Sequence, residues 1–526
     1  MDIIKLDLNK TDPDLPTDAE IRFQVAFLAS VSALVASFVA RFLFDAPLVP
    51  ELLAQFIFAV APIWMVEVAV GILGPFAKHL AFLGCTVIYL IALIAATVGF
   101  LGSVGKAKSN LNRFVFPISF AIGIWLVTVG VILSVLGGGL FGSHLPQGAV
   151  YTSITQLIIH TIYALGIVYF SRRYIDRTLS ADGVMTSVIS RRRLVRGVGY
   201  AVLAVGIYDI GKSLIGSWLQ SGSGRVKHGN GEFPNIDNLA LEITPNKDFY
   251  QVSKNAFDPQ VDVRRWKLEV TGLVDNPIEL SFDDLKSFPA VEKYATLACI
   301  SNEVGGDLIG NALWRGARLK DVLAKAGLRE GVVDVALHAS DDYTDSIPLE
   351  RAVAGETLLV YEMNGEPLTP EHGFPVRLLV PGIYGMKNVK WITRIEPIAF
   401  DLKGYWQRRG WDDRAEYKTL SRIDAPDSRT KGETTIAGVA FAGDRGVSKV
   451  EVSTDGGASW ELAEIKPPLS ALTWVLWWKR WGPAQSGKHR LVVRATDGRN
   501  QTQTSQYAPP APSGSSGYHS VIISSD

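Results

Sequence analysis

The sequence predicts a multi-domain protein with an N-terminal bundle of transmembrane helices, a middle region of short strands and helices, and a C-terminal all-β sandwich of immunoglobulin type. The chain has 526 residues, enough for several domains. Its apolar residues, 48% of the total, are concentrated before residue 221. From residue 434 onward, short strand patterns and turn signals recur at regular spacing, as is typical of a β-sandwich.

Charge excludes one class of partner. Lys and Arg together number 52, as do Asp and Glu, so the formal net charge is zero. The chain therefore lacks the basic excess of a protein that binds nucleic acid. The two cysteines, Cys85 and Cys299, lie in different predicted domains, and we expect no disulfide between them.

Six apolar runs each approach the roughly 20 residues that cross a bilayer. They lie at 21–44, 52–73, 79–101, 114–141, 150–170 and 195–219. A buried core helix explains any one of them, but six in series favour a membrane domain over 21–220, after an acidic segment at 1–20. The last run is the weakest, since Asp209 and Lys212 interrupt it.

Basic residues predict the orientation of these runs. Lys and Arg cluster at 106–113, after the third run, and at 172–177 and 191–196, between the fifth and the sixth. With these loops in the cytoplasm, everything after residue 219 lies outside, on the periplasmic side of a cell membrane. Residues 190–196 (SRRRLVR) also resemble the twin-arginine export motif. Ordinary anchoring by positive charge would need the same arginines.

The membrane part holds few groups that suggest chemistry. His79 and His160 lie within predicted spans, at different depths, and Glu67 lies within the second. Facing imidazoles can ligate haem, and a buried carboxylate is costly in lipid. A haem or quinone site is one interpretation; we favour a plain lipid anchor and do not expect a haem.

Cys299 is the main candidate for chemistry. Residues 295–300 are apolar and partly β-branched, which predicts a buried strand, and Gly305-Gly306 predict a turn soon after it. Cys299 thus stands where a rigid strand gives way to a loop, a good place to hold a thiolate against a metal. A buried free cysteine that packs as a small hydrophobe is the alternative.

Residues 361–397 are the second candidate region. His372, Arg377, Lys387 and Lys390 are spaced around tight Gly and Pro turns. Backbone N–H groups and cations together favour an anion, so the pattern predicts a cradle for a phosphorylated ligand. Four unrelated surface charges are the alternative.

The region from about 246 to 504 resembles the sulfite oxidase family of molybdenum-cofactor enzymes, in the membrane-anchored bacterial type. The matching stretches are TLACISNEVGGDLIGNALWRGARLKDVLAKAG, SDDYTDSIPLERA, MNGEPLTPEHGFPVRLLVPGIYGMKNVKWITRIE, VEVSTDGGASWELA and VRATDG. The resemblance implies a mixed α/β molybdopterin-binding catalytic domain at 243–400 and an immunoglobulin-like, dimerisation-type domain at 401–508. A linker at 221–242 and a flexible tail at 509–526 complete the prediction.

The same resemblance assigns roles to residues. It makes Cys299 the molybdenum ligand and Tyr343 the active-site tyrosine that passes a proton. It places cofactor contacts at Tyr250, Gln251, Asn302, Ser340, His372, Arg377, Lys387, Asn388 and Lys390. The expected cofactor is molybdenum-molybdopterin, whose own chemistry performs the difficult step.

One segment departs from the family pattern and leaves the substrate open. Sulfite oxidases proper carry an arginine in the segment that here reads Tyr-Gln-Val-Ser-Lys at 250–254, where Lys254 comes a few residues late. Sulfite, an S-oxide or an N-oxide remain candidates, with electrons exchanged with a cytochrome or quinone and with a homodimer as one possible assembly. The alternative from another class is a non-catalytic, membrane-anchored scaffold protein with a vestigial cofactor cradle.

Overall fold

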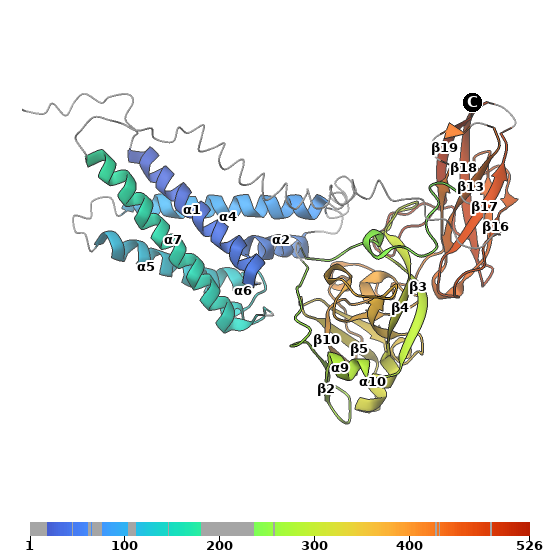
Figure 1. The fold of residues 1–526 in the computed structure, drawn as a ribbon, viewed down its shortest axis with the longest axis horizontal. Coiled ribbons are helices and arrows are strands. Elements are labelled where there is room, and N and C mark those ends of the chain that lie inside the picture. Colours follow the sequence, from blue (N-terminus) through green and yellow to red (C-terminus); the bar gives the residue numbers. More distant parts are fainter. Residues whose placement is uncertain are drawn as a thin grey trace, which may run out of the picture. The chain divides into compact units, whose positions relative to one another are not determined.

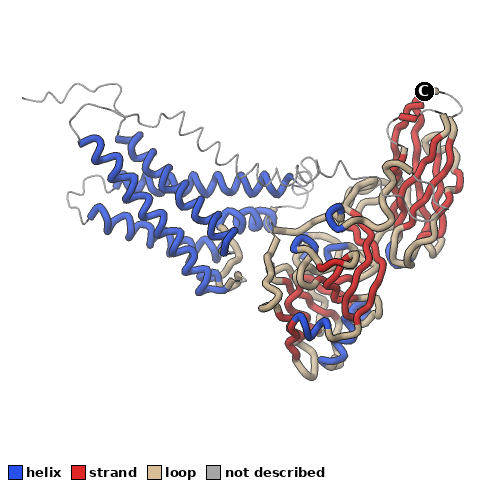
Figure 2. The backbone as a smooth tube through the Cα atoms, viewed as in Figure 1, coloured by secondary structure: helices blue, strands red, loops and turns tan. Residues whose placement is uncertain are grey.

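The computed structural model describes residues 18–44, 46–61, 65, 76–103, 112–145, 147–179, 236–255, 258–426, 429–430, 432–483 and 486–525. The chain forms two compact units, one of residues 1–61 and 68–217 and the other of residues 62–67 and 218–526 (Figure 1). The described part of the first is helical, whereas strands dominate the second (Figure 2).

The described part of the first unit contains four helices long and apolar enough to cross a membrane, at Ala19–Phe44, His79–Ser103, Val115–Val135 and Gly148–Arg172. They belong to α1 (Asp18–Phe44), α4 (Phe76–Ser103), α5 (Asn112–Val127) with its π-helical continuation Thr128–Ile132 and α6 (Leu133–Val135), and α7 (Gly148–Leu179). Helix α1 packs against α4 and α7, and small residues permit close approach: an added Cβ at Gly166 would lie 3.3 Å from Ala29 Cα.

The second predicted span differs from the structure. Helix α2 covers Val49–Val60, only 12 residues, and ends at Ala61, whose backbone is extended (φ −64°, ψ 136°). Pro62 follows, and a proline disfavours helical geometry in the residue before it. The prediction of one helix over 52–73 is therefore wrong at its start and at Ala61.

Several predictions fall outside the described residues, namely the sixth run, the twin-arginine-like motif, most of the linker, Glu67 and most of the acidic N-terminal segment. His160 is described, and it is buried. Its Nδ1 lies 2.7 Å from the carbonyl oxygen of Gln156 and its Nε2 lies 3.4 Å from Thr128 Oγ1. Both ring nitrogens thus face protein atoms.

The middle region contains two sheets and is richer in strands than a mixed α/β prediction implies. One sheet has the order β2-β1-β10-β5-β6, and the other has the order β3-β4-β7-β8 with β9 also paired to β7. Their strands are β1 (Lys267–Val270), β2 (Ile278–Ser281), β3 (Ala290–Ala298), β4 (Ile309–Arg318), β5 (Asp334–Ala339), β6 (Thr344–Pro348), β7 (Leu358–Met363), β8 (Glu366–Pro367), β9 (Arg377–Leu379) and β10 (Ile392–Ile398).

Short helices between these strands follow local sequence signals. Helix α9 (Phe282–Lys286) begins after Ser281, which forms a capping box with Asp284. Helix α10 (Leu319–Ala326) ends at Gly327, where φ is +74°. Helix α11 (Leu349–Ala352) follows β6 directly. Buried side chains from α9, α10 and both sheets form one core.

The C-terminal region contains a four-stranded sheet, β11-β13-β17-β16, and a five-stranded sheet, β12-β19-β18-β14-β15. The strands are β11 (Leu420–Ala425), β12 (Arg429–Thr430), β13 (Thr434–Phe441), β14 (Val447–Ser453), β15 (Glu461–Leu462), β16 (Glu464–Ile465), β17 (Val475–Trp481), β18 (Gly487–Asp497) and β19 (His519–Ser525). Side chains of both sheets, with Trp477 at 0% exposed, share one core. Immunoglobulin-like topology stays a prediction.

The predicted flexible tail is wrong for its last residues. Strand β19 pairs antiparallel with β18 from Gly487↔Ser525 to Val493↔His519. Its Val521, Ile522 and Ile523 are β-branched residues that suit a pleated sheet, and Ile523 is 2% exposed. The Pro- and Gly-rich residues before β19 are typical of a flexible segment, and the prediction extended that segment to the end of the chain.

Candidate cofactor site

Cys299 follows β3 directly, and β3 pairs with β4 in one unbroken antiparallel register. The Cys299 amide donates to the Leu308 carbonyl at 2.9 Å, which extends the pairing beyond the strand end. The residue is 8% exposed, and its Sγ lies 2.9 Å from Ser301 Oγ. Burial raises the pKa of the Cys299 thiol, and the contact with Ser301 opposes this. A metal cation is therefore better placed than water to stabilise the thiolate.

Three tyrosines surround this thiol closely enough to interact with it electrostatically: Tyr250, Tyr384 and Tyr417. Burial raises the pKa of Tyr384 to about 12 and raises the pKa of the other two as well, so all three keep their protons at neutral pH. Tyr417 accepts a hydrogen bond from the Ala298 amide at 3.1 Å. An added Cβ at Gly385 would lie 2.6 Å from Tyr250 Oη, so this approach requires glycine.

Arg377 begins β9 and is 5% exposed. Its terminal nitrogens donate to the carbonyl oxygens of His372 at 3.3 Å and Asn388 at 3.2 Å. Its Nε is buried and lacks a hydrogen-bond partner, and no carboxylate pairs with it among the residues that the structure describes. Burial lowers the pKa of Arg377 to about 10. A buried cation with an unused donor is costly unless an anion binds there.

Lys390 and Arg377 both pack against the backbone of Gly373. This glycine has φ +103°, and an added Cβ would lie 3.0 Å from Lys390 Cβ and 3.1 Å from Arg377 Cβ. The Lys390 ammonium donates to the carbonyl oxygen of Glu371 at 2.8 Å and lies 4.8 Å from the centroid of the Trp391 ring. Two cations thus flank one glycine turn.

His372 lies at the same turn as a neutral donor. Its Nε2 lies 2.8 Å from the carbonyl oxygen of Asn246, which can only accept, so Nε2 carries the proton. Burial, and then the charges of Arg377 and Lys390, lower the pKa of His372 to about 4, although the bond to Asn246 opposes this. At neutral pH the ring therefore adds no charge to the two cations.

Ser340 directly follows β5, and its backbone is hydrogen-bonded to that of Trp391. Its amide donates to the Trp391 carbonyl at 3.0 Å, and Trp391 takes the unusual φ of +52°. The Ser340 hydroxyl is buried and lacks a partner in the described part of the chain. It is a second polar group that awaits a ligand.

Tyr343 lies on the turn that leads into β6. Its hydroxyl donates to Asp345 Oδ2 at 3.0 Å and lies 2.9 Å from the carbonyl oxygen of Met386. Its ring centroid lies 5.7 Å from that of Tyr405. Burial, and then the Asp345 charge, raise the pKa of Tyr343 well above its usual value. The hydroxyl therefore stays protonated at neutral pH.

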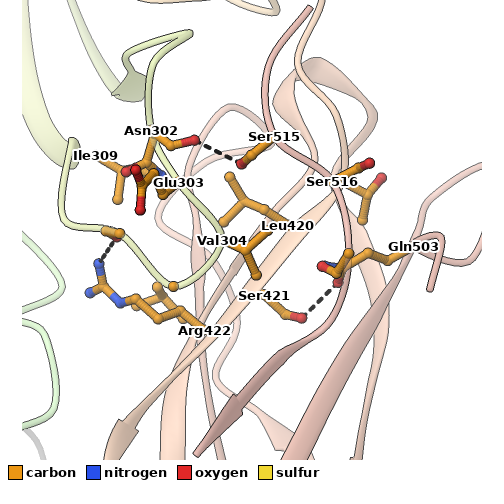
Figure 3. A pocket seen from close by; sticks show the side chains of 15 residues that line it. Asn302, Glu303, Val304, Ile309, Leu420, Ser421, Arg422, Gln503, Ser515 and Ser516 are labelled. Atoms are coloured by element: carbon orange, nitrogen blue, oxygen red, sulfur yellow. Dashed lines mark hydrogen bonds between the residues drawn. The ribbon is translucent and has the colours of Figure 1, made fainter. Parts of the chain in front are cut away.

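The loop after Cys299 is held by the C-terminal region. Arg422 donates to the carbonyl oxygen of Gly306 at 2.8 Å, and Ser515 Oγ donates to the carbonyl oxygen of Asn302 at 2.7 Å, across a small pocket (Figure 3). An added Cβ at Gly305 would lie 2.3 Å from the His519 ring. Residues of the middle region and of the C-terminal region thus both hold the loop that follows Cys299.

Two family models match the second unit. Residues 255–406 match an oxidoreductase molybdopterin binding domain, and residues 419–509 match a Mo-co oxidoreductase dimerisation domain. The chain is 36% identical to the mitochondrial sulfite oxidase of Rattus norvegicus over 319 residues, which cover 51% of this chain and 58% of the rat protein. It is 41% identical to the oxidoreductase YuiH of Bacillus subtilis over 155 residues, which cover 30% of this chain and 76% of YuiH.

The chain is also 32% identical to the sulfite oxidase of Gallus gallus over 322 residues, which cover 51% of this chain and 69% of the chicken protein. The chain belongs to the sulfite oxidase family of molybdopterin oxidoreductases. It spans little more than half the length of the mitochondrial relatives that it matches. Among solved structures, the sulfane dehydrogenase SoxCD of Paracoccus pantotrophus aligns with TM-score 0.49 and 25% identity, over 54% of this chain and 82% of that one.

The residues present fit the cofactor of this family. Arg377 Nε and Ser340 Oγ are buried donors without partners among the described residues, and Arg377 and Lys390 provide two positive charges at one turn. Charge-assisted hydrogen bonds to such a pair suit the phosphate of a pterin. The buried Cys299 thiol supplies a soft sulfur ligand for a sulfur-rich metal centre.

Two other predicted cofactor contacts, Asn388 and Lys387, have side chains that bind other parts of the protein. Asn388 accepts from the Val380 amide at 2.6 Å and donates to the Tyr384 carbonyl at 3.2 Å, so its side chain shapes the 381–388 loop. Lys387 pairs with Asp345 at 3.0 Å rather than joining the two cations at Gly373. Direct contact of either side chain with the cofactor stays a prediction.

The last two predicted cofactor contacts, Asn302 and Gln251, differ from each other in burial. Asn302 is buried, and its Oδ1 accepts from the Leu308 amide at 2.9 Å, which shapes the loop after Cys299. Gln251 is exposed, next to the half-buried Tyr250. Cofactor binding by these residues stays a prediction too.

Sequence analysis missed Asp345 and Tyr417, whose side chains contact the site residues. A usable signal existed for Asp345. It lies two residues after Tyr343 on an extended segment, and alternate residues of a strand point to the same side. No such signal marks Tyr417, which reaches Ala298 across 119 residues of sequence.

Proposed function

We propose that this chain is a membrane-anchored molybdenum-cofactor enzyme that transfers an oxygen atom to or from a small substrate. The supporting observation is the group of buried, unpartnered donors at Arg377 and Ser340, beside Lys390 and within the family's molybdopterin-binding region. When bound, the cofactor supplies the two-electron exchange of an oxygen atom.

The protein's own residues divide the remaining work. Cys299 holds the metal with a thiolate whose position the β3–β4 pairing fixes. Arg377, Lys390 and Ser340 hold the anionic part of the cofactor. Tyr343 holds a proton at its hydroxyl, where it can be passed to Asp345.

Two cations lie at Tyr405, whose ring is the neighbour of Tyr343, and they support a substrate that carries negative charge or a polar S–O or N–O bond; one of them, Lys254, also pairs with Asp341 at 3.7 Å. Lys254 lies 5.7 Å from the Tyr405 ring centroid, and the guanidinium carbon of Arg409 lies 3.6 Å from it. Arg409 Nε is buried and lacks a partner among the described residues. Sulfite, S-oxides and N-oxides all satisfy this chemistry, and the rat relative is named for sulfite.

With X as the substrate, oxidation with water as the oxygen source balances as X + H₂O → XO + 2H⁺ + 2e⁻, and reduction is the reverse. The electrons pass to or from an external cytochrome or quinone. The match to a Mo-co oxidoreductase dimerisation domain at 419–509 supports a homodimer of the full chain.

A substrate panel tests the proposed activity. Full chain purified with molybdenum is expected to turn over at least one of sulfite, an S-oxide and an N-oxide with an artificial electron carrier. Heat-treated protein and protein expressed without molybdate are the controls. Bound cofactor without turnover of any panel member would contradict the enzyme. It would favour the scaffold alternative, as would the absence of the visible absorption of a molybdenum–dithiolene centre.

The four long apolar helices support insertion in the cell membrane, with residues 243–526 outside. Protease added to intact spheroplasts is expected to digest this part, and digestion only after lysis would contradict the orientation. The double substitution of Arg191→Lys and Arg192→Lys keeps both positive charges. If the twin-arginine motif drives export, this variant leaves the C-terminal part protected inside; unchanged digestion would favour ordinary anchoring by positive charge.

A further inference from the structure

A chain of alternating acids and bases leads from the Tyr343 hydroxyl toward the protein surface. Tyr343 donates to Asp345 Oδ2 at 3.0 Å, and the other Asp345 oxygen lies 3.0 Å from Lys387 Nζ. Lys387 Nζ lies 3.5 Å from Asp413 Oδ1. The exposed fraction of the side chains rises along the chain, from 0% for Asp345 to 3% for Lys387 and 36% for Asp413.

The Asp345 side chain is 0% exposed and is enclosed by polar neighbours. Besides Tyr343 and Lys387, it accepts from the Ser346 amide at 2.8 Å and from Gln407 Nε2 at 3.4 Å. Gly404 closes over it, since an added Cβ there would lie 2.7 Å from Asp345 Cα. Burial raises the pKa of Asp345 even though Lys387 attracts its charged form, so the carboxylate accepts a proton more readily than an exposed one would.

The outer end is open to water and charged. Asp413 lies 2.6 Å from Lys403 Nζ, and Lys403 also lies 2.6 Å from Asp401. Burial alone would raise the pKa of Asp413, but the hydrogen bond from Lys403 and the charges of Lys387 and Lys403 lower it. Asp413 is therefore anionic at neutral pH, so its carboxylate is free of a proton when Lys387 transfers one, and its lowered pKa favours release of that proton to water.

We propose that Asp345, Lys387 and Asp413 form a proton relay between Tyr343 and solvent. This inference depends on the proposed oxygen-atom transfer, which releases or consumes two protons for each pair of electrons. To release one proton, Tyr343 passes its hydroxyl proton to Asp345 as it receives one from the site. Lys387 gives an N–H proton to Asp413 and takes the proton from Asp345, and Asp413 gives its proton to water. Every group ends in its starting state, and no electron moves along this path.

A buried ion pair alone would explain part of this arrangement, but not all of it. Burying Asp345 and Lys387 costs desolvation that their attraction repays only in part, so stability is a weak reason for the pair. The structure also aligns Tyr343 at one end and an exposed acid at the other. A purely structural pair needs neither.

Asp413→Ala in the full, cofactor-loaded chain tests the relay at its exposed end. Turnover is expected to fall about 10-fold in weakly buffered solution and to recover as formate or imidazole is added. This loss is below the roughly 10²-fold or more contributed by a group that transfers a proton at the reacting atoms, because Asp413 is the outermost group and water can replace it in part. The solvent deuterium isotope effect is expected to be larger than in the parent protein. Asp401→Ala is the matched control, because it removes a Lys403 partner and leaves the Lys387 contact intact.

The two proposals fail in different ways. An Asp413→Ala protein that is as active as Asp401→Ala in weak buffer, or that small acids do not rescue, would overturn the relay while leaving the enzyme in place. A parent protein without molybdenum or turnover would overturn the enzyme itself.

A second measurement needs no activity. In cofactor-free protein, Asp345→Asn removes the charge that raises the pKa of Tyr343 together with burial, so this tyrosine is expected to ionise at lower pH. Ultraviolet difference spectra against the same protein carrying Tyr343→Phe isolate this residue. An unchanged Tyr343 titration in Asp345→Asn would show that the two groups are not coupled, and the relay would be wrong.

Discussion

Replacing Cys299 with serine is expected to lower turnover more than 100-fold. A serine hydroxyl stays protonated where a thiol can ionise onto a metal, so the replacement removes the proposed protein sulfur ligand. The loss should exceed the roughly 10–100-fold that follows removal of an outer partner of a metal ligand. Molybdenum per chain and turnover of the preferred panel substrate are the measurements.

Two controls separate the ligand from its surroundings. Cys85→Ala removes the other cysteine, which lies in α4, and should leave turnover unchanged. Ser301→Ala removes the 2.9 Å contact to Cys299 Sγ and should reduce turnover much less than Cys299→Ser does. The prediction fails if Cys299→Ser keeps full molybdenum and full turnover, since the thiol would then be only a packed side chain.

Replacing Arg377 with methionine is expected to weaken cofactor binding by about 10- to 100-fold. Hydrogen bonds to charged groups contribute about 1.5–3 kcal/mol, and each 1.4 kcal/mol is a factor of ten in affinity. Pterin released from the purified protein, measured by fluorescence after oxidation, should fall together with molybdenum. Arg377→Lys keeps the charge but loses the planar guanidinium, so its cofactor content should lie between that of the parent protein and that of Arg377→Met.

Arg315→Met is the matched control for this prediction. Arg315 lies on β4, is 44% exposed in its side chain and pairs with Glu362, so its loss should leave cofactor content unchanged. Cofactor-free Arg377→Met should unfold with a free energy close to that of the parent, because this buried cation lacks a carboxylate partner among the described residues. Full pterin content in Arg377→Met would show that the cradle binds something else, or nothing.

Local sequence signals predicted much of the second unit correctly. The strand that precedes Cys299 and the strand patterns from residue 434 onward both depend on residues within a few positions. The family resemblance then named the residues of the cofactor region, and the structure brings Arg377, Lys390, His372 and Ser340 to the turns around Gly373 and Trp391. Strand β19 was missed because its pairing partner lies about 30 residues away in the chain.

Tertiary contacts decided which similar side chains serve the same site. Lys387 and Lys390 are three residues apart and have the same side chain, yet Lys387 turns to Asp345 while Lys390 turns to the carbonyl of Glu371. The direction of each depends on the loop that Asn388 holds and on partners far away in sequence. No periodicity in an irregular loop encodes that choice.

By itself, the sequence determined the apolar runs of the first unit, the cysteine at a strand end and the glycine-shaped turns that carry the cations. These features follow from short-range sterics and hydrophobic pattern, which act between neighbouring residues. Only the tertiary structure decided that Tyr417 supports Ala298, that Arg377 keeps an unused donor, and that Asp345 joins Tyr343 to Lys387. Such contacts form where distant segments pack together and exclude water, so burial and pairing in the folded chain determine them.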